Sequence, residues 1–350
     1  MPIRRRSLLA ALASAPALGL RAGEARGYTP PGPADRVAAL GPLDELSPAL
    51  RAAFAPDIDD LPLPRPRRGD WLDEHHERGQ SYAAFVRGGY TRVERGRGTI
   101  VVVPIVAGES PRGPGELGGG APSVATLCDF VGRYFSLPAR AGAALPIDEV
   151  GATRRGQGRR TQYRSGDLLE ALKRRLPRDA YCVIGVTDVD LYPGPGWNFV
   201  FGEATFHERV GVHSFARYDP AFYGEARGAA GERRILARGL KVMAHEVGHM
   251  VSMHHCVHFH CVMNGSNNLD EADRAPFHLC PVCRRKLHAA LPHDPITREA
   301  SLAEFYRGQG LVVPAERHER RVAMMQGVAA AGERAREVAA AIRGLVPSDR

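Results

Sequence analysis

Aromatic residues and cysteine are scarce in this chain of 350 residues, at 7% and six residues respectively. Basic residues are not interleaved with aromatic ones, as they are in proteins that stack single-stranded nucleic acid. The net charge of +8 comes largely from arginine spread along the whole sequence, which favours solubility and weak affinity for acidic surfaces. We therefore expect no nucleic-acid partner, although the basic charge leaves a nucleic-acid binder as an alternative.

A long hydrophobic run is also missing, so we expect no transmembrane segment. The apolar stretch Leu8–Leu20 is too short to span a bilayer. It follows the cluster Arg4–Arg6 and precedes small residues, which is typical of an export signal over residues 1–27, here of the twin-arginine type. This predicts a periplasmic or extracellular protein. The alternative is a disordered leader rich in arginine and alanine, on a cytoplasmic protein.

The chain has no internal repeat, and its length suffices for one large core or two smaller ones. Residues 28–70 are rich in proline and charge, which predicts a tethered, largely irregular lead-in. Residues 71–310 carry the strand, helix and motif patterns and form the main domain. Residues 311–350 are predicted as a C-terminal helical extension, whose last helix, Arg317–Leu345, is exposed and packed onto the rest of the protein.

Strand and helix patterns alternate from Thr99 to Tyr218, which favours a mostly parallel sheet covered by helices. The clearest strands are Thr99–Val106 and Ala180–Val186, and the clearest helix between them is Pro122–Leu137. Three further segments complete this prediction: a helix followed by a turn at Trp71–Gly89, a basic loop at Gly151–Arg160 and an edge strand at Val210–Tyr218.

The strongest chemical pattern is His245-Glu246-Val247-Gly248-His249, within a helix predicted from about Gly231 to about Met253. Residues four apart share a helix face, so His245 and His249 can present imidazoles to one metal ion. Apolar residues on the other face, such as Met243 and Val247, should pack on the sheet. Glu246 lies one residue round and can act as general base on a metal-bound water. A bare pattern of this kind also occurs on ordinary exposed helices.

Downstream residues extend the pattern. His255 follows six residues after His249, and Met263 follows eight residues later, as in the extended zinc motif of metzincins. The neighbouring His254 is an alternative third ligand, but the spacing favours His255. Imidazole suits zinc, and three histidines leave a fourth position for water, which is typical of a catalytic site.

Four cysteines are interleaved with these residues: Cys256, Cys261, Cys280 and Cys283. A C-x4-C pair followed by a C-x-x-C pair fits a closed tetrahedral thiolate site that stabilises the fold. Two disulfides are the alternative, especially in an exported protein. The other two cysteines, Cys128 and Cys182, lie in apolar surroundings and are predicted to be core residues.

The run His245–Leu287 resembles the signature of the archaemetzincin family of zinc metallopeptidases, and Asp179–Ala204 with Arg209–Tyr218 forms a second matching stretch. The resemblance covers roughly residues 56–287. It implies an α/β (α+β) fold of the zincin type: a mostly parallel twisted sheet with an antiparallel edge strand, an active-site helix and a small cysteine-zinc subdomain. It also implies two zinc ions, one catalytic on His245, His249 and His255, and one structural on the four cysteines.

We therefore expect a zinc-dependent metallopeptidase that hydrolyses peptide or protein substrates, with Glu246 as general base. A catalytically silent zinc protein that binds peptides or partners is the alternative, and the intact Glu246 argues against it. The segment Val210–Tyr218 is expected above the cleft, where it either pairs with an extended peptide by strand addition or is an ordinary edge strand. The acids Asp270, Glu271 and Asp273 either support the metal ligands by hydrogen bonds or lie in a solvated turn, and we favour the turn.

One position departs from the family pattern, because Ser252 stands where the motif has glycine. Glycine there ends the helix in a left-handed conformation and turns the chain so that the third histidine reaches the metal. Serine adopts this conformation at a cost of roughly 1 kcal/mol. We expect this cost to affect activity rather than zinc binding, so that Ser252→Gly keeps or improves zinc affinity.

Overall fold

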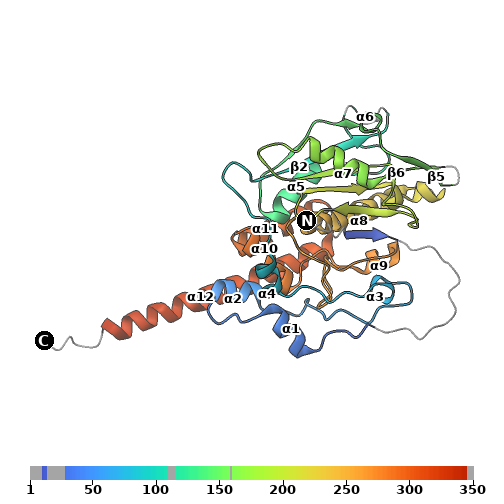
Figure 1. Ribbon diagram of the computed structural model, residues 1–350. Helices are drawn as coiled ribbons and strands as arrows, with labels where there is room; N and C mark the ends of the chain where they lie inside the picture. Colours follow the sequence, from blue (N-terminus) through green and yellow to red (C-terminus); the bar gives the residue numbers. More distant parts are fainter. Residues whose placement is uncertain (1–9, 14–27, 109–112, 114, 158–159, 345–350) are drawn as a thin grey trace, which may run out of the picture.

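The computed structural model describes residues 10–13, 28–108, 113, 115–157 and 160–344 of the chain. A ten-stranded sheet forms the upper part of the molecule in Figure 1, and a group of helices forms its lower part. The strands are β1 (Ala10–Ala13), β2 (Thr99–Val106), β3 (Ala139–Ala141), β4 (Leu145–Pro146), β5 (Arg154–Gln157), β6 (Arg160–Arg164), β7 (Ala180–Thr187), β8 (Asp190–Tyr192), β9 (Val200–Ala204) and β10 (Val210–Ser214). The helices are α1 (Pro33–Leu40), α2 (Pro48–Phe54), α3 (Trp71–Glu74), α4 (Tyr82–Gly88), α5 (Val124–Phe135), α6 (Ile147–Val150), α7 (Ser165–Arg174), α8 (Gly228–Met250), α9 (Leu269–Arg274), α10 (Pro281–Ala290), α11 (Pro295–Gly308) and α12 (Val312–Gly344), with 3-10 turns η1 (Ala216–Tyr218) and η2 (Pro220–Tyr223).

The sheet has a parallel half and a mixed half. Its order is β3-β2-β7-β10-β9-β8-β6-β5, and β4 also pairs with β2. Strands β3, β2, β7 and β10 run parallel to one another, whereas β9 runs antiparallel to β10. The predicted α/β class, with a largely parallel sheet and an antiparallel strand, is confirmed.

Strand β10 corrects the prediction of an edge strand at Val210–Tyr218. It ends at Ser214 and lies inside the sheet, with β7 on one side and β9 on the other. The alternation that suggested an edge strand comes from His213, whose side chain is fully buried against the rings of Phe215 and Tyr218. In the sequence, a buried histidine cannot be told from an exposed one. The segment therefore looked like a strand with one face in solvent, and the prediction was wrong.

On the side away from β10, strand β9 is joined to β8 through the pairing of Val200 with Leu191, and we call this side its outer edge. Its residues Glu203 and Ala204 pair with β10 along one edge and with Ala11 and Ala10 of β1 along the other. Strand β1 belongs to the predicted export signal, whose remaining residues lie outside the described ones. The pairing shows that the outer edge of β9 accepts an extended strand in antiparallel orientation.

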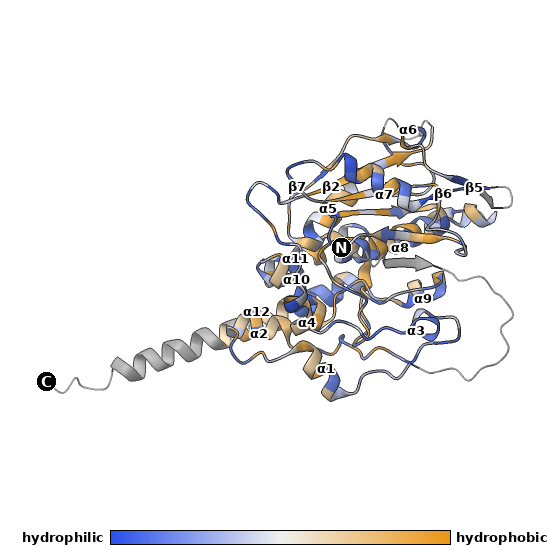
Figure 2. Ribbon diagram, in the orientation of Figure 1, coloured by the Kyte–Doolittle hydropathy of each residue, from blue (hydrophilic) through white to orange (hydrophobic). Residues whose placement is uncertain are grey.

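Helices cover both faces of the sheet. Helices α5 and α8 pack on one face and α7 packs on the other. Successive residues of β2 point to the two sides, since Ile100 and Val102 belong to one core and Val101 to the other. Hydrophobic residues are accordingly concentrated in the strands and on the inner faces of these helices (Figure 2). Burial on both faces is the usual setting of parallel strands.

Two polar segments differ from their predictions. The segment Trp71–Gly89 forms two short helices, α3 and α4, with residues 75–81 outside any helix or strand. The predicted basic loop Gly151–Arg160 contributes β5 and the start of β6, which pair in an antiparallel hairpin. The hairpin lacks the apolar alternation of a half-buried strand because its arginines lie largely in solvent.

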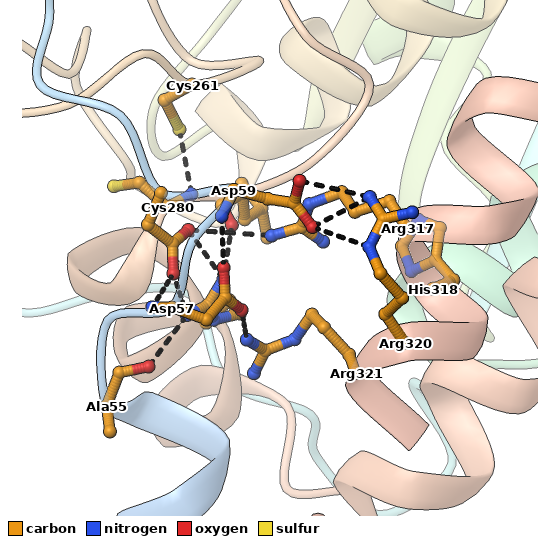
Figure 3. Close-up of polar contacts among 12 residues, drawn as sticks. Ala55, Asp57, Asp59, Cys261, Cys280, Arg317, His318, Arg320 and Arg321 are labelled. Carbon is orange, nitrogen blue, oxygen red and sulfur yellow. Dashed lines mark hydrogen bonds and ion pairs between the residues drawn. The ribbon is translucent and has the colours of Figure 1, made fainter. Parts of the chain in front are cut away.

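The lead-in before residue 71 contains α1 and α2, which its proline content does not predict, and buried charges fasten it to the C-terminal helices. Arg284 of α10 donates to both carboxylate oxygens of Asp60, at 2.9 and 2.7 Å, and Arg317 of α12 donates to one of them at 3.5 Å. Two further ion pairs join α12 to the same loop (Figure 3): Arg320 with Asp59, and Arg321 with Asp57.

Helix α12 thus packs on the rest of the protein, as predicted, but its first part is buried, whereas its alanine and arginine content predicted an exposed helix. Arg317, His318, Arg321 and Met325 are buried against the lead-in and α11. Arginine-rich helical sequence does not distinguish a solvated face from one that meets buried carboxylates. Among the described residues, no helix combines the length and the apolar character that crossing a membrane requires.

Candidate active site and metal centres

Helix α8 carries the first cluster of potential metal ligands. His245 and His249 lie one turn apart near its C-terminal end, with their Nε2 atoms 2.9 Å apart. His255, from the loop that follows, completes the group, and the ligand atoms of the three histidines lie within 4.8 Å of one another. The other face of α8, including Met243 and Val247, is buried in the core, as the spacing of apolar residues predicts.

The first two imidazoles are oriented by backbone carbonyl groups. His245 Nδ1 donates to the carbonyl oxygen of Val262 at 2.8 Å, and His249 Nδ1 donates to that of Met253 at 2.7 Å. A neutral imidazole has one N–H, so these bonds leave the Nε2 lone pairs free for a metal. Burial lowers the pKa of His245 to about 3 and the pKa of His249 well below its ordinary value, so both rings are neutral near pH 7.

The third imidazole has a different partner. His255 Nδ1 lies 2.9 and 3.1 Å from the two carboxylate oxygens of Glu77, while its buried Nε2 has no hydrogen-bond partner among the described residues. Burial alone would raise the pKa of Glu77, but the charge interaction and hydrogen bond with His255 lower it. The carboxylate is thus held ionised beside the ring.

Glu246 is the carboxylate expected to act as base, and it is fully buried. Neither of its oxygens has a hydrogen-bond partner among the described residues. Strand β9 passes directly over it, since a Cβ atom at Gly202 would stand 2.6 Å from Glu246 Oε1, and only glycine permits this approach. Burial, and secondly the nearby Glu203, raise the pKa of Glu246 well above its ordinary value.

Met263 packs beneath the histidine cluster, where the motif predicts a methionine. Its Sδ atom would lie 2.4 Å from a Cβ atom at Gly248, the residue before His249. Because Gly248 has no side chain, the loop that carries Met263, called the methionine loop below, can pack against α8 between the two helical histidines. The carbonyl of Met263 also accepts the backbone N–H of Cys256, at 2.8 Å, which links this loop to the cysteine cluster.

The helix ends as expected, with Ser252 in the left-handed conformation at φ 76°. Its N–H donates to the carbonyl of His249 at 2.8 Å, and the N–H of Met253 donates to that of Gly248 at 3.1 Å. This pair of bonds is the common glycine-type helix end, here with serine in the glycine position.

The hydroxyl group of Ser252 makes contacts that a glycine cannot make. It donates to the carbonyl oxygen of Phe206 at 3.0 Å and accepts the backbone N–H of Thr91 at 3.2 Å. The hydroxyl group thereby joins the segments around Thr91 and Phe206 to the turn that leads to His255. The sequence shows the departure from glycine, but not these partners.

The four cysteines form a second cluster, with their Sγ atoms within 4.8 Å of one another. All four are buried free thiols, so the alternative of two disulfides is not the arrangement of this structure. The backbone N–H groups of Met263 and Cys280 point at Cys261 Sγ, at 3.5 and 3.3 Å. Such N–H···S contacts stabilise the thiolate form that binds a metal.

Residues outside the two clusters have other roles. His254 is exposed and its ring contacts Phe206 at 4.8 Å between centroids, so geometry does not favour it as a ligand; His258 and His260 also lie outside both clusters. The predicted solvated turn is instead helix α9. There Glu271 accepts the backbone N–H of Trp71 at 2.9 Å, and Asp273 forms an ion pair with Arg238 at 2.6 Å.

Sequence reasoning missed the segment from Trp71 to Gln80, which covers the third histidine. The Trp71 ring meets His255 edge-on with centroids 5.0 Å apart, and His75 stacks on Trp71 at 4.0 Å. No local pattern indicates this, because the segment lies more than 170 residues before the histidine that it contacts.

Both clusters fit zinc by the chemistry of their donors. Tetrahedral zinc with Zn–N distances of about 2.0–2.1 Å places its nitrogens about 3.3 Å apart; the Nε2 atoms of His245 and His249 lie 2.9 Å apart, and the ligand atoms of all three histidines lie within 4.8 Å of one another. Within the described ranges, the buried Nε2 of His255 and the two oxygens of Glu246 have no hydrogen-bond partners, which is costly unless a metal and its water stand there. Four buried thiols are the donor set of a closed structural site.

A mixed sheet, with a helix that carries two of three converging histidines beside a buried glutamate, is the arrangement of zinc metallopeptidases, a class of hydrolases. Residues 162–289 match the model of Peptidase family M54. The matched region includes all seven predicted ligands and Glu246.

Within that class the chain is similar to the archaemetzincins. It is 39% identical over 166 residues to Archaemetzincin-2 of Pongo abelii, covering 41% of this chain and 46% of that protein. It is 29% identical over 286 residues to Archaemetzincin-2 of Homo sapiens, covering 73% of this chain and 77% of that one. The chain thus spans about half of the first relative and about three quarters of the second.

A solved structure is also similar. The crystal structure of archaemetzincin from Methanopyrus kandleri is 26% identical in sequence and aligns with a TM-score of 0.41, over 57% of this chain and 99% of that chain.

Proposed function

We propose that this chain hydrolyses peptide bonds, with one zinc ion on His245, His249 and His255 and with Glu246 as general base. The observation that carries the proposal is the position of the Glu246 carboxylate. It is fully buried, one residue from a histidine of the cluster, and has no hydrogen-bond partner in the part of the chain that the structure describes. A protein that only binds peptides has no use for such a group.

Each residue then has a defined part in the reaction. The three histidines would hold the ion by their Nε2 atoms, and zinc supplies Lewis acidity toward a water molecule and the scissile carbonyl. Glu246 takes the proton of the attacking water and returns it to the amine that leaves. The hydrogen bonds of His245 and His249 to backbone carbonyls keep the rings in the tautomer that this requires.

We further propose a second, structural zinc ion on Cys256, Cys261, Cys280 and Cys283. Four ligands complete a tetrahedral shell and leave no position for water. The cluster joins the methionine loop to α10, and Arg284, the residue after Cys283, binds Asp60 of the lead-in. The second ion would therefore hold together the three segments that surround the active site.

The outer edge of β9 is the proposed position of the substrate backbone. It lies over Glu246, because Gly202 contacts that carboxylate, and it already accepts the antiparallel strand β1. An extended peptide added there would gain backbone hydrogen bonds and bring a scissile bond to the cluster. This replaces Val210–Tyr218, which lies inside the sheet, as the strand that pairs with a peptide.

The test is a peptide-library digest with purified protein of known metal content. Glu246→Ala should abolish detectable hydrolysis, because removal of a general base usually lowers the rate by about 10²–10⁴-fold. Bound zinc should stay at the wild-type amount. A matched control is Glu232→Ala, an exposed glutamate on the same helix. Turnover that survives in Glu246→Ala would refute the mechanism, and a wild-type protein with full zinc and no hydrolysis would favour a silent peptide binder.

A further inference from the structure

The three histidines of the cluster do not have equivalent partners. His245 and His249 donate their Nδ1–H to neutral carbonyl oxygens, but His255 Nδ1 meets the carboxylate of Glu77. His255 is also the one ligand outside helix α8, so no helical hydrogen bond fixes its backbone. A ligand in a loop depends more than the others on what its side chain contacts.

The loop that carries Glu77 is fitted closely around His255. Gly79, with φ +68°, packs so tightly on Val257 that a Cβ atom there would lie 2.4 Å from its Cγ2 atom. Gln80 donates to the carbonyl of Ser252 and accepts the N–H of His254, both at 3.2 Å. Glu77 is thus held between contacts on both sides of the third histidine.

The loop is also anchored from behind. Lys286, on α10 just after the cysteine cluster, donates to the backbone carbonyl of Gln80 and to its side-chain oxygen. The Lys286 side chain is buried, so this contact is screened little by solvent. The placement of Glu77 is a built feature of the fold and not a chance surface contact.

We propose that Glu77 is a positioning residue for the third zinc ligand: its carboxylate fixes the tautomer and orientation of His255 and strengthens Nε2 as a donor. This rests on the proposed function only in taking the three histidines as a zinc site. A segment outside the region that matches the peptidase family thereby takes part in the active site. The segment Trp71–Gln80 then cannot be removed without weakening the metal centre.

Metal affinity tests this without reliance on turnover. The full chain is stripped of metal at the histidine site and titrated with Co²⁺ alone, and then with Zn²⁺ against a competing chelator. Thiolate-to-cobalt absorption reports the cysteine site, so the histidine site is followed separately. Glu77→Ala should weaken the histidine site by about 10–100-fold, the usual effect of losing a group that orients a ligand.

Two further variants separate charge from structure. Glu77→Gln keeps an acceptor for Nδ1–H but no charge, so it should fall between wild type and Glu77→Ala. Glu74→Gln makes the same charge change in the same segment, at a residue that accepts a hydrogen bond from Asn267 at 3.3 Å rather than from a histidine of the cluster, and should leave affinity unchanged.

The outcomes are distinct. If Glu77→Ala binds metal at the histidine site as wild type does and merely unfolds at lower temperature, Glu77 is a structural residue and the inference is overturned. If wild type binds metal as described but cleaves no peptide, the proposed function fails while the role of Glu77 stands.

Discussion

The two ligand clusters lie in one short stretch of chain but leave different groups unsatisfied. The cysteine cluster has four buried sulfurs, and Cys261 additionally receives two backbone N–H groups. The histidine cluster has three nitrogens and, beside them, a glutamate whose oxygens have no hydrogen-bond partner among the residues that the structure describes. A closed donor set stabilises structure, whereas an open one with an unpaired base is suited to chemistry.

The clusters also differ in what carries their ligands. His245 and His249 project from a buried helix that the sheet supports independently of any metal. The cysteines come from a loop and from the start of α10, which have few strand or helix hydrogen bonds between them. We therefore expect the fold around the cysteines to depend on its metal, and the fold around the histidines to survive without it.

Removing one cysteine ligand should give the largest effect. Cys283→Ser leaves three thiolates, and we expect the free energy of unfolding to fall by at least about 4 kcal/mol, since structural zinc contributes several times that to small zinc domains. Denaturant unfolding with zinc analysis measures it. Cys128→Ser, a half-buried cysteine outside the cluster, is the control and should change stability little.

Removal of metal tests the same difference between the histidine site and the cysteine site. A chelator should take the zinc of the histidine site first, with the fold retained, and should unfold the region around the cysteines only when the second ion leaves. Equal lability of the two ions, or one ion with an intact fold after complete removal, would contradict the distinction between open and closed sites.

The next largest effect is expected from a substitution that disturbs the packing beneath the histidine cluster. Gly248→Ala places a Cβ atom against Met263, whose loop must shift, and overpacking of this kind costs about 1–3 kcal/mol. Zinc affinity at the histidine site should fall with it. Gly308→Ala, in α11 with open space around it, is the control and should be neutral or slightly stabilising. An unaffected Gly248→Ala protein would mean that Met263 does not support the site.

Strand β1 competes with a substrate if both use the outer edge of β9. Deletion of residues 1–27 should therefore lower KM for peptides, by up to about tenfold if the pairing contributes about 1.4 kcal/mol. In the full chain, Ala11→Pro removes a backbone N–H from β1 and should have the same sign. Unchanged KM in both variants would show that the substrate binds elsewhere.

The proposal of export bears on this comparison. An export signal over residues 1–27 would be removed on secretion and would free the edge of β9, whereas an uncleaved leader would keep it covered. Determination of the N-terminus of the protein recovered from the periplasm or medium separates the two.

Features set by local spacing could be predicted from the sequence. Two histidines four residues apart on a helix must share a face, and the apolar positions Met243 and Val247 fix which face is buried. The ligand sets that the spacing suggested are the sets that the structure brings together. The alternation of strands and helices likewise gave the sheet class.

Features set by distant contacts could not be predicted. Glu77 lies 178 positions from His255, and nothing near it in the sequence indicates a ligand partner. Asp60 meets arginines from two helices far along the chain, so the proline-rich lead-in gave no sign of a buried ion network. The order of β9 and β10 in the sheet follows from strand pairing. The alternation within a single segment such as Val210–Ser214 does not show which strands lie beside it.

The smallest expected effect concerns Ser252, where two terms oppose each other. Its left-handed φ costs roughly 1 kcal/mol for a residue with a Cβ atom. Its hydroxyl group, however, bonds Phe206 and Thr91, and each such bond contributes about 1 kcal/mol. The hydrogen bonds thus offset or exceed the strain, which the sequence alone did not show.

Two substitutions separate these terms. Ser252→Ala keeps the strain and loses both bonds, so it should lower the free energy of unfolding by about 1–2 kcal/mol. Ser252→Gly loses the same bonds but relieves the strain, while it raises the entropy of the unfolded chain, so it should lie within about 1 kcal/mol of wild type. Denaturant unfolding and zinc titration of both variants measure this. If Ser252→Gly is clearly more stable and binds zinc more tightly, strain dominates at this turn; if it is as unstable as Ser252→Ala, the left-handed conformation costs this serine nothing.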